Sequence, residues 1–310
     1  MARDGQGGKA RRPGAKGAQG SQNAQGAQGA QGAQAAVAKA RRRPSPSAAA
    51  AQSEDGPERI AKRLARAGVA SRREAERMIA DGRVRLNGRR LETPAVTVTP
   101  ADRIEVDGKP VAEPEPARLW RYHKPAGLVT TARDEQGRPT VFDRLPPELP
   151  RVVSVGRLDL TSEGLLLLTN DGELKRRLEL PSTGWLRRYR VRVHGRPDAE
   201  RLAPLERGIE IEGERFQPMQ VAVDRQQGAN AWLTLGLREG RNREIRRALS
   251  AVGFDVNRLI RVSYGPFQLG ELAAGAVEEV RPKVLADQLG LKRSGGRPDQ
   301  RRSGGGRHGD

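Results

Sequence analysis

Residues 156–174 read Gly-Arg-Leu-Asp-Leu-Thr-Ser-Glu-Gly-Leu-Leu-Leu-Leu-Thr-Asn-Asp-Gly-Glu-Leu. The apolar run Leu165–Leu168 has the length of a strand, so we expect a short buried strand there. Asn170-Asp171-Gly172 is a turn signal that ends it. Asp159 lies in the segment before this strand, beside Arg157. The pattern therefore places one carboxylate and one guanidinium in a loop that enters a buried strand.

The sequence around this run mixes strand-length and helical segments. Further strands are expected at Val152–Val155, Tyr189–Val193, Met219–Val223 and Trp232–Leu237. Helices are expected at Glu173–Leu178, Ala199–Leu205 and Asn242–Val252. Because strands outnumber helices and several strands are joined by short turns, residues 119–290 are predicted to form an α+β domain on a mixed, largely antiparallel sheet.

Residues 57–111 are predicted to form a separate small module. Ile60 and Leu64 share one face of a first helix, which Gly68 can end. Ser71 and Glu74 form a capping box that opens a second helix. Short strands follow, with tight hairpin turns at Asn87-Gly88 and Asp107-Gly108.

The remaining segments have compositions that do not support a packed core. Residues 1–55 and 291–310 are basic and of low complexity, so we expect two disordered tails. A transit peptide is a second interpretation of the first tail, which is rich in Arg and poor in acidic residues. Residues 112–118, which contain Ala-Glu-Pro-Glu-Pro, are predicted to be a stiff linker.

The net charge of +19 over 310 residues indicates a polyanionic partner. Residues 1–50 carry +8 and residues 291–310 carry +4, which leaves +7 for residues 51–290. Nucleic acid is the first candidate, because neutralised phosphates release counterions. A membrane surface is the second, but the sequence has no long basic amphipathic helix and no apolar stretch near the ~20 residues that span a bilayer.

Several other chemistries lack the residues they need. The chain has no cysteine and three scattered histidines, so neither a disulfide nor a zinc site is expected. The absence of cysteine is consistent with a protein of the reducing cytoplasm. Glu163 follows Asp159 by four residues and could suggest a carboxylate pair of the glycosidase kind. Four residues on a turn do not guarantee that the two groups meet. Gly240-Arg241 is not a phosphate loop, since no Gly-Lys-Ser/Thr follows.

The phrase from Gly156 to Leu174 closely resembles the catalytic motif of the RsuA/RluB family of bacterial ribosomal RNA pseudouridine synthases. His123-Lys124-Pro125-Ala126-Gly127 and Asn257–Gly265 resemble two more phrases of the family. Residues 138–146 resemble a stretch of the branch that acts on large-subunit ribosomal RNA. The resemblance covers roughly residues 57–285. It implies an S4-like RNA-binding domain followed by a catalytic domain that uses no cofactor and no metal.

The resemblance also implies roles for particular residues. In this family an aspartate, here Asp159, acts on the target ribose while the uracil ring leaves, turns and rejoins through carbon. It does so either as a nucleophile or as a base toward a neighbouring proton. Tyr189 would lie against the target base. The arginine that pairs with Asp159 and orients it is placed on Arg246, with Arg241 as the second choice. At positions 243–244 some relatives have His-Gln where this chain has Arg-Glu.

RNA contacts are expected from two groups of arginines. The segments 71–75 and 82–88 carry the resemblance to S4 domains, which present a basic helix and loop to RNA. The expected contacts are Arg66, Arg72, Arg73 and Arg77 in the small module and Arg157, Arg241, Arg243 and Arg247 in the larger domain. The ordinary alternative is a solvated charged face.

The sequence therefore predicts a monomeric cytoplasmic enzyme that isomerises a specific uridine of ribosomal RNA. The large-subunit (23S) branch is favoured over the small-subunit (16S) branch. A non-catalytic ribosome assembly factor is the competing class. The combination of Asp159, Tyr189 and Arg246 disfavours it, because a protein that only binds RNA has no need of those three together.

Overall fold

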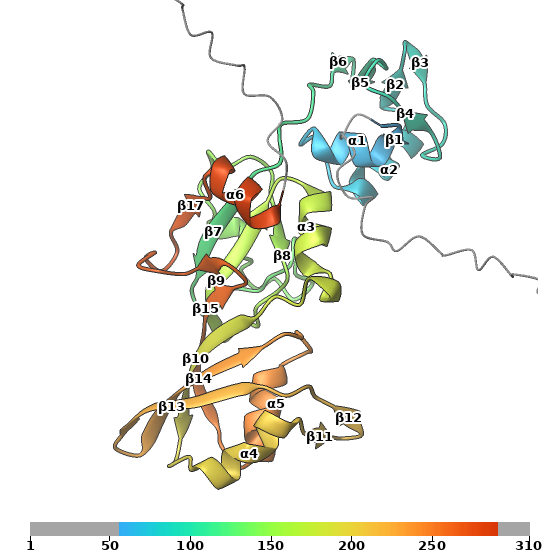
Figure 1. Cartoon of the computed structure of the whole chain (residues 1–310). Coiled ribbons are helices and arrows are strands. Elements are labelled where there is room, and N and C mark those ends of the chain that lie inside the picture. Colours follow the sequence, from blue (N-terminus) through green and yellow to red (C-terminus); the bar gives the residue numbers. More distant parts are fainter. Residues whose placement is uncertain (1–55, 291–310) are drawn as a thin grey trace, which may run out of the picture. The chain divides into compact units, whose positions relative to one another are not determined.

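The structure is a computed structural model that describes residues 56–290. The predicted tails, 1–55 and 291–310, lie outside the described residues. The described part contains a small N-terminal module and a larger α+β domain (Figure 1). No helix within residues 56–290 is long and apolar enough to cross a membrane.

The small module forms as the sequence predicts. Its elements are β1 (Glu58–Arg59), α1 (Ile60–Arg66), α2 (Arg72–Ala80), β2 (Val84–Leu86), β3 (Arg89–Arg90), β4 (Thr97–Val98), β5 (Ile104–Val106) and β6 (Lys109–Pro110). The Ser71 hydroxyl accepts a hydrogen bond from the Glu74 backbone N–H at 3.1 Å, which confirms the cap of α2. Asn87 and Gly88 have φ values of 51° and 80°, as a tight hairpin turn requires.

The larger domain is built on one nine-stranded sheet. Its helices are η1 (Phe142–Arg144), α3 (Gly172–Glu179), η2 (Pro181–Thr183), α4 (Ala199–Arg207), α5 (Glu244–Ala251) and α6 (Pro282–Leu289). Its strands are β7 (Leu119–Lys124), β8 (Val153–Val155), β9 (Ser162–Thr169), β10 (Arg187–His194), β11 (Glu210–Ile211), β12 (Glu214–Arg215), β13 (Gln220–Gln227), β14 (Asn230–Leu237), β15 (Val256–Tyr264), β16 (Phe267–Gln268) and β17 (Val277–Glu279).

The order of seven strands in the main sheet is β13-β14-β10-β15-β9-β7-β17, and the other two lie beside this path, with β16 paired to β15 and β8 paired to β9. Neighbours along this path are antiparallel except β9 and β15, which are parallel. The expectation of a largely antiparallel mixed sheet is therefore confirmed. The parallel pair of β9 and β15 joins the two halves of the sheet. The hydrogen bonds between these two strands therefore determine how their residues lie relative to each other.

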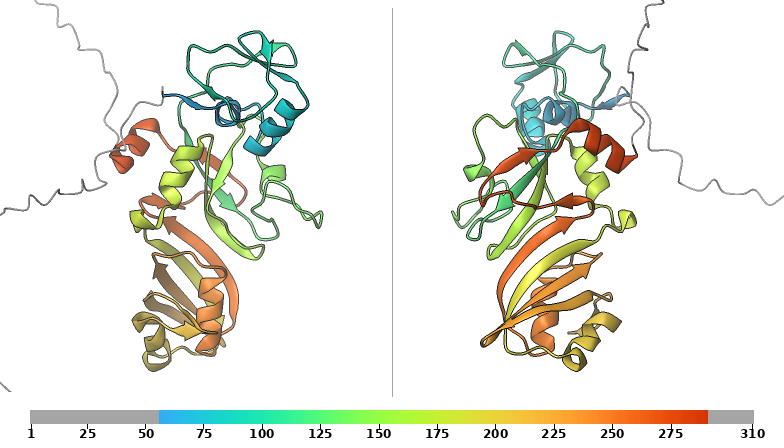
Figure 2. Two further views of the ribbon diagram at one scale, coloured as in Figure 1. Left: turned by 90° about the vertical axis from the view of Figure 1, so that its right-hand side faces the viewer. Right: turned by 60° about the vertical axis from the view of Figure 1, so that its left-hand side comes forward.

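Two cores lie on opposite faces of this sheet. Leu166 and Leu168 belong to the core that includes α4 and α5, whereas Leu165 and Leu167 belong to the core that includes α3 and α6. The run Leu165–Leu168 is therefore buried on both sides, which explains why it shows no alternation of polar and apolar residues. Figures 1 and 2 show α4 and α5 on one face of β10, β13, β14 and β15.

Candidate active site

The backbone around Asp159, in the loop between β8 and β9, is held by the segment that follows β7. The Thr130 hydroxyl donates to the Leu158 carbonyl at 2.8 Å. The Gly127 N–H donates to the Leu160 carbonyl at 2.8 Å. The residues on either side of Asp159 are thus fixed by hydrogen bonds, which hold the backbone that carries the carboxylate.

Lys124 holds the loop between β8 and β9 by hydrogen bonds to its backbone. Its side chain is fully buried, and its Nζ donates to the carbonyls of Ser162 at 2.8 Å and Leu160 at 3.4 Å. Burial lowers the pKa of Lys124 to about 8, an effect that the nearby Asp159 carboxylate opposes. The ammonium group therefore acts as a positioning group for the loop and as a nearby cation for Asp159.

Asp159 opens into a cavity of about 470 Å³. This volume is in the range of small-molecule sites and accommodates a nucleotide base. The Asp159 side chain is 32% exposed. The sheet side of the cavity is lined by Arg187, Tyr189, Leu259, Arg261 and Tyr264. Within residues 56–290, no group of three or more His, Asp or Glu side chains is arranged to hold a metal ion.

The cation nearest to the Asp159 carboxylate comes from the loop before α5. Arg243 Nη1 lies 3.9 Å from Asp159 Oδ2, and the Arg243 side chain is half exposed. Arg243 has a φ of 48°, in the left-handed region. This conformation costs a non-glycine residue roughly 1 kcal/mol, and such strain is concentrated at functional sites. The strained turn directs the Arg243 side chain toward the cavity.

Arg261 is a cavity residue that the sequence analysis did not single out. It is 2% exposed, and its Nε donates to the Leu165 carbonyl at 2.7 Å. Its Nη2 has no hydrogen-bond partner among the residues that the structure describes. The available signal was its place in the buried alternation Leu259, Arg261, Ser263 of β15. A buried guanidinium with an unused donor, lining a cavity, can bind an oxygen atom of a substrate.

Comparisons with known proteins show the family to which the chain belongs. The family model for RNA pseudouridylate synthases matches residues 118–251, and the S4 domain model matches residues 58–104. An uncharacterized RNA pseudouridine synthase of Rickettsia felis is 44% identical over 228 residues, which cover 74% of this chain and 99% of that protein. The chain belongs to the RNA pseudouridine synthase family.

Two further similarities are consistent with this membership. Ribosomal large subunit pseudouridine synthase B of Salmonella typhi is 45% identical to this synthase over 218 residues, which cover 68% of this chain and 75% of that protein. A crystal structure of a pseudouridylate synthase shares the fold with a TM-score of 0.53, at 24% identity, over 73% of this chain and 96% of that one. The predicted order, an S4 domain followed by a pseudouridine synthase domain, is confirmed.

The synthase places Arg246 differently from the sequence expectation. Arg246 Nη1 donates to the Val256 carbonyl at 3.0 Å, and Nη2 donates to the Thr161 carbonyl at 3.3 Å. The expected ion pair between Arg246 and Asp159 is therefore replaced by one with Arg243. Arg246 still affects the site, because it fixes the backbone two residues after Asp159. Burial lowers the pKa of Arg246, and the charge of Asp159 opposes this.

Arg241 and Arg247 are held together by acidic groups of the synthase domain. Arg241 Nη1 and Arg247 Nη1 each lie 2.6 Å from a different oxygen of Glu214 on β12. Both guanidinium groups also pack over the Phe216 ring. These contacts fix the start of α5. Both guanidinium groups are therefore occupied by contacts within the protein.

Glu244 anchors the same loop from within the core. It is 4% exposed, and its Oε2 accepts a hydrogen bond from the Arg241 backbone N–H at 2.9 Å. Burial raises the pKa of Glu244 to about 7, and the neighbouring Glu239 carboxylate also raises it. The protonation of Glu244 is thereby coupled to the loop that carries Arg243.

We expect the Glu244→Gln variant to lose a pH dependence of stability. The unfolded state releases the Glu244 proton near pH 4.5, whereas the folded state keeps it to about 7. Between these values the unfolded state binds fewer protons, so the free energy of unfolding of the wild type falls as the pH rises. The fall is roughly 2 kcal/mol between about pH 5 and pH 8. Urea denaturation at these pH values measures it, and equal slopes for the two proteins would contradict the assignment.

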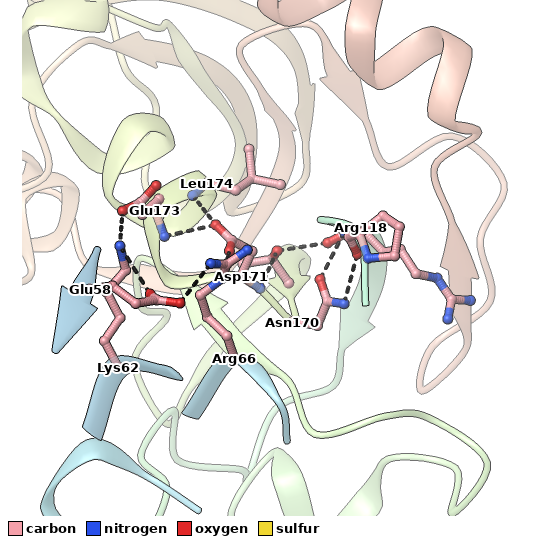
Figure 3. Close-up of polar contacts among 10 residues, drawn as sticks. Glu58, Lys62, Arg66, Arg118, Asn170, Asp171, Glu173 and Leu174 are labelled. Atoms are coloured by element: carbon pink, nitrogen blue, oxygen red, sulfur yellow. Dashed lines mark hydrogen bonds and ion pairs between the residues drawn. The ribbon is translucent and has the colours of Figure 1, made fainter. Parts of the chain in front are cut away.

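The four arginines of the S4 domain that were predicted to bind RNA differ in their exposure to solvent. Arg72, Arg73 and Arg77 on α2 are exposed. Arg66 lies 3.0 Å from Glu58 and 3.7 Å from Asp171, and Figure 3 shows its side chain among these acidic groups. Asp171 also caps α3 by accepting hydrogen bonds from two backbone N–H groups. Arg66 therefore contributes ion pairs, whereas the three arginines of α2 are exposed to solvent.

Proposed function

We propose that this synthase converts a specific uridine of large-subunit ribosomal RNA, in the bacterial cytoplasm, to pseudouridine, with Asp159 as the catalytic carboxylate. The observation that carries the proposal is the half-buried Asp159 carboxylate at the opening of a nucleotide-sized cavity, on a backbone fixed from both sides. The name of the Salmonella typhi relative supports the choice of the large subunit.

The reaction is an isomerisation, so atoms and electrons balance within the nucleotide. The bond between ribose C1′ and uracil N1 breaks, the ring turns, and a bond forms between C1′ and C5. The C5 proton leaves and N1 gains a proton. Asp159 acts at the ribose in one of two ways: it attacks C1′ and forms an ester bond that breaks when C5 bonds to C1′, or it removes the C2′ proton and returns it when C5 bonds to C1′. Both routes use a fixed carboxylate beside a cation, which Arg243 and Lys124 supply.

The other cavity residues bind the nucleotide. The Tyr189 ring forms part of the cavity wall and packs against the uracil as it turns. Arg261 offers its unused Nη2 donor to a carbonyl oxygen of the base. Arg157 is exposed at the rim, where it contacts a backbone phosphate. Extrusion of the target base costs a few kcal/mol, which these phosphate and stacking contacts offset.

The direct test uses the purified chain with transcripts of the two ribosomal RNAs. We expect pseudouridine at one position of the large-subunit RNA and at none of the small-subunit RNA. Modification confined to the small-subunit RNA would show that the small-subunit RNA is the substrate. The assignment of the reaction would not change. A protein that binds both RNAs and modifies neither, either naked or within ribosomal particles, would favour the assembly-factor interpretation.

A further inference from the structure

The face of β10 that points away from the cavity is strongly basic. Along this strand Tyr189, Val191 and Val193 are buried in the core under α4 and α5. The alternate residues Arg188, Arg190 and Arg192 therefore point to the opposite face, because successive side chains of a strand alternate. Helices α4 and α5 cover the first face only, so no helix within residues 56–290 lies over the second face of β10, β13 and β14 (Figure 2).

Neighbouring strands extend this row of arginines across the sheet. Arg192 is opposite Trp232 of β14 on one side and Arg258 of β15 on the other. Trp232 is in turn opposite Arg225 of β13. We define the basic sheet face as Arg188, Arg190, Arg192, Arg225, Trp232 and Arg258. Like charges directly opposite each other on neighbouring strands are destabilising, and at the pair Arg192 and Arg258 only Arg258 has an acidic partner within residues 56–290.

Acidic side chains neutralise only part of this face. Arg258 makes a two-bond ion pair with Glu163, and Arg190 lies 3.7 Å from Asp224. The five guanidinium groups and these two carboxylates leave a net charge of +3. Arg188, Arg192 and Arg225 make no ion pair within residues 56–290. Arg192 Nε is in addition buried and without a hydrogen-bond partner among the described residues.

Trp232 gives this face an aromatic group among the cations. Its side chain is half-buried, and the Arg190 guanidinium lies 4.9 Å from the ring centroid. A sheet face that carries an aromatic ring and unpaired arginines has the two features that bind unpaired nucleotides. The bases stack on the ring, and the phosphates meet the cations.

We propose that the basic sheet face binds single-stranded RNA that flanks the modified uridine. The proposal rests on RNA being the substrate and extends it, because this surface lies on the opposite face of the sheet from the Asp159 cavity. β13 is the edge strand of the sheet, so flanking RNA on the basic sheet face would pass this edge or an end of the strands to reach the cavity. The face would bind flanking nucleotides while the cavity holds the target.

The test compares RNA binding by the full-length wild type and by the Arg188→Gln/Arg190→Gln/Arg192→Gln variant. The probes are an RNA hairpin with a single-stranded extension on each side and the same hairpin without extensions. We expect the variant to bind the extended hairpin about ten-fold more weakly at low salt. The slope of log affinity against log salt should fall by about 2, since each single-stranded phosphate contact contributes about 0.7. An unchanged slope would overturn the proposal.

Two matched variants separate phosphate binding from a structural defect. The corresponding triple Lys variant keeps the charges and should restore the salt slope, because Lys binds phosphate as a point charge. Arg188→Gln should weaken binding of the extended hairpin more than Arg138→Gln, which removes an exposed arginine already paired with Asp134. Equal losses for these two would show a general charge effect and contradict the proposal.

Trp232→Ala tests the stacking part on its own. We expect affinity for the extended hairpin to fall about ten-fold with an unchanged salt slope, since stacking does not depend on counterion release. Stronger binding to a fully duplex extension than to the single-stranded one would also overturn the proposal. Because all these readouts are equilibrium binding, they are independent of the catalytic assignment. A chain that makes no pseudouridine would refute the proposed function and leave this result standing.

Discussion

We expect Asp159→Asn to reduce conversion of uridine to pseudouridine by roughly 10³-fold or more, with little change in RNA affinity. The amide has the shape of the carboxylate but can neither attack the ribose nor accept its proton. Its backbone is fixed by Thr130 and Gly127, so the variant loop should keep its position. Single-turnover measurement of pseudouridine in a ribosomal RNA transcript, together with a binding measurement, gives both quantities.

Glu163→Gln is the matched control for this prediction. Glu163 also lies near the start of β9, but its carboxylate bonds to Arg258 on the other face of the sheet from the cavity. At enzyme concentrations that saturate the RNA, where a change of affinity through Arg258 has no effect, we expect conversion by this variant to remain within about three-fold of the wild type. Comparable losses in the two variants would refute a specific role for Asp159.

We expect Gly164→Ala to lower the free energy of unfolding by about 3–5 kcal/mol. Gly164 lies in the parallel pair of β9 and β15, opposite Arg261, with a φ of 99°. A Cβ at this position would lie 2.3 Å from the Arg261 backbone oxygen and 2.7 Å from its nitrogen. Since both contacts are with backbone, no side chain can move to relieve them. Urea denaturation of the purified variant measures the loss.

Gly137→Ala separates the two causes of this effect. Gly137 has a φ of 70°, but a Cβ there would meet no atom within 4 Å. This variant therefore carries only the backbone strain, and we expect it to lose about 1 kcal/mol. If Gly164→Ala were no worse than Gly137→Ala, the close approach of β9 and β15 would not be a constraint on the fold.

The local signals in the sequence predicted most of the fold. The Ser71 and Glu74 cap, the Asn87-Gly88 turn and the buried run Leu165–Leu168 all depend on neighbouring residues, and all three formed as expected. Helix α6 and strands β7 and β15 were not predicted as elements. The partner strands in a sheet depend on contacts between distant residues, so the parallel pairing of β9 with β15 could not be derived from local patterns.

The loop that carries the candidate catalytic residue could be predicted from the sequence, but the side chain that pairs with Asp159 could not. Asp159 and Tyr189 were both predicted as site residues, and both line one cavity in the structure. The choice of Arg246 as the ion-pair partner rests on its match to the last basic position of the family's phrase that starts at Gly240. In the structure Arg243 has a left-handed conformation, and Arg243, rather than Arg246, lies within ion-pair distance of Asp159. The left-handed conformation of Asn87 is signalled by its Asn-Gly turn, whereas that of Arg243 has no such signal in the sequence.

The most direct test is a map of pseudouridines in the ribosomal RNA of cells that lack this protein, compared with the same cells complemented by the wild type or by Asp159→Ala. We predict that one large-subunit pseudouridine is missing, that the wild type restores it, and that Asp159→Ala does not, although both proteins are present at equal amounts. Restoration by Asp159→Ala would contradict the assignment of this carboxylate as the catalytic group.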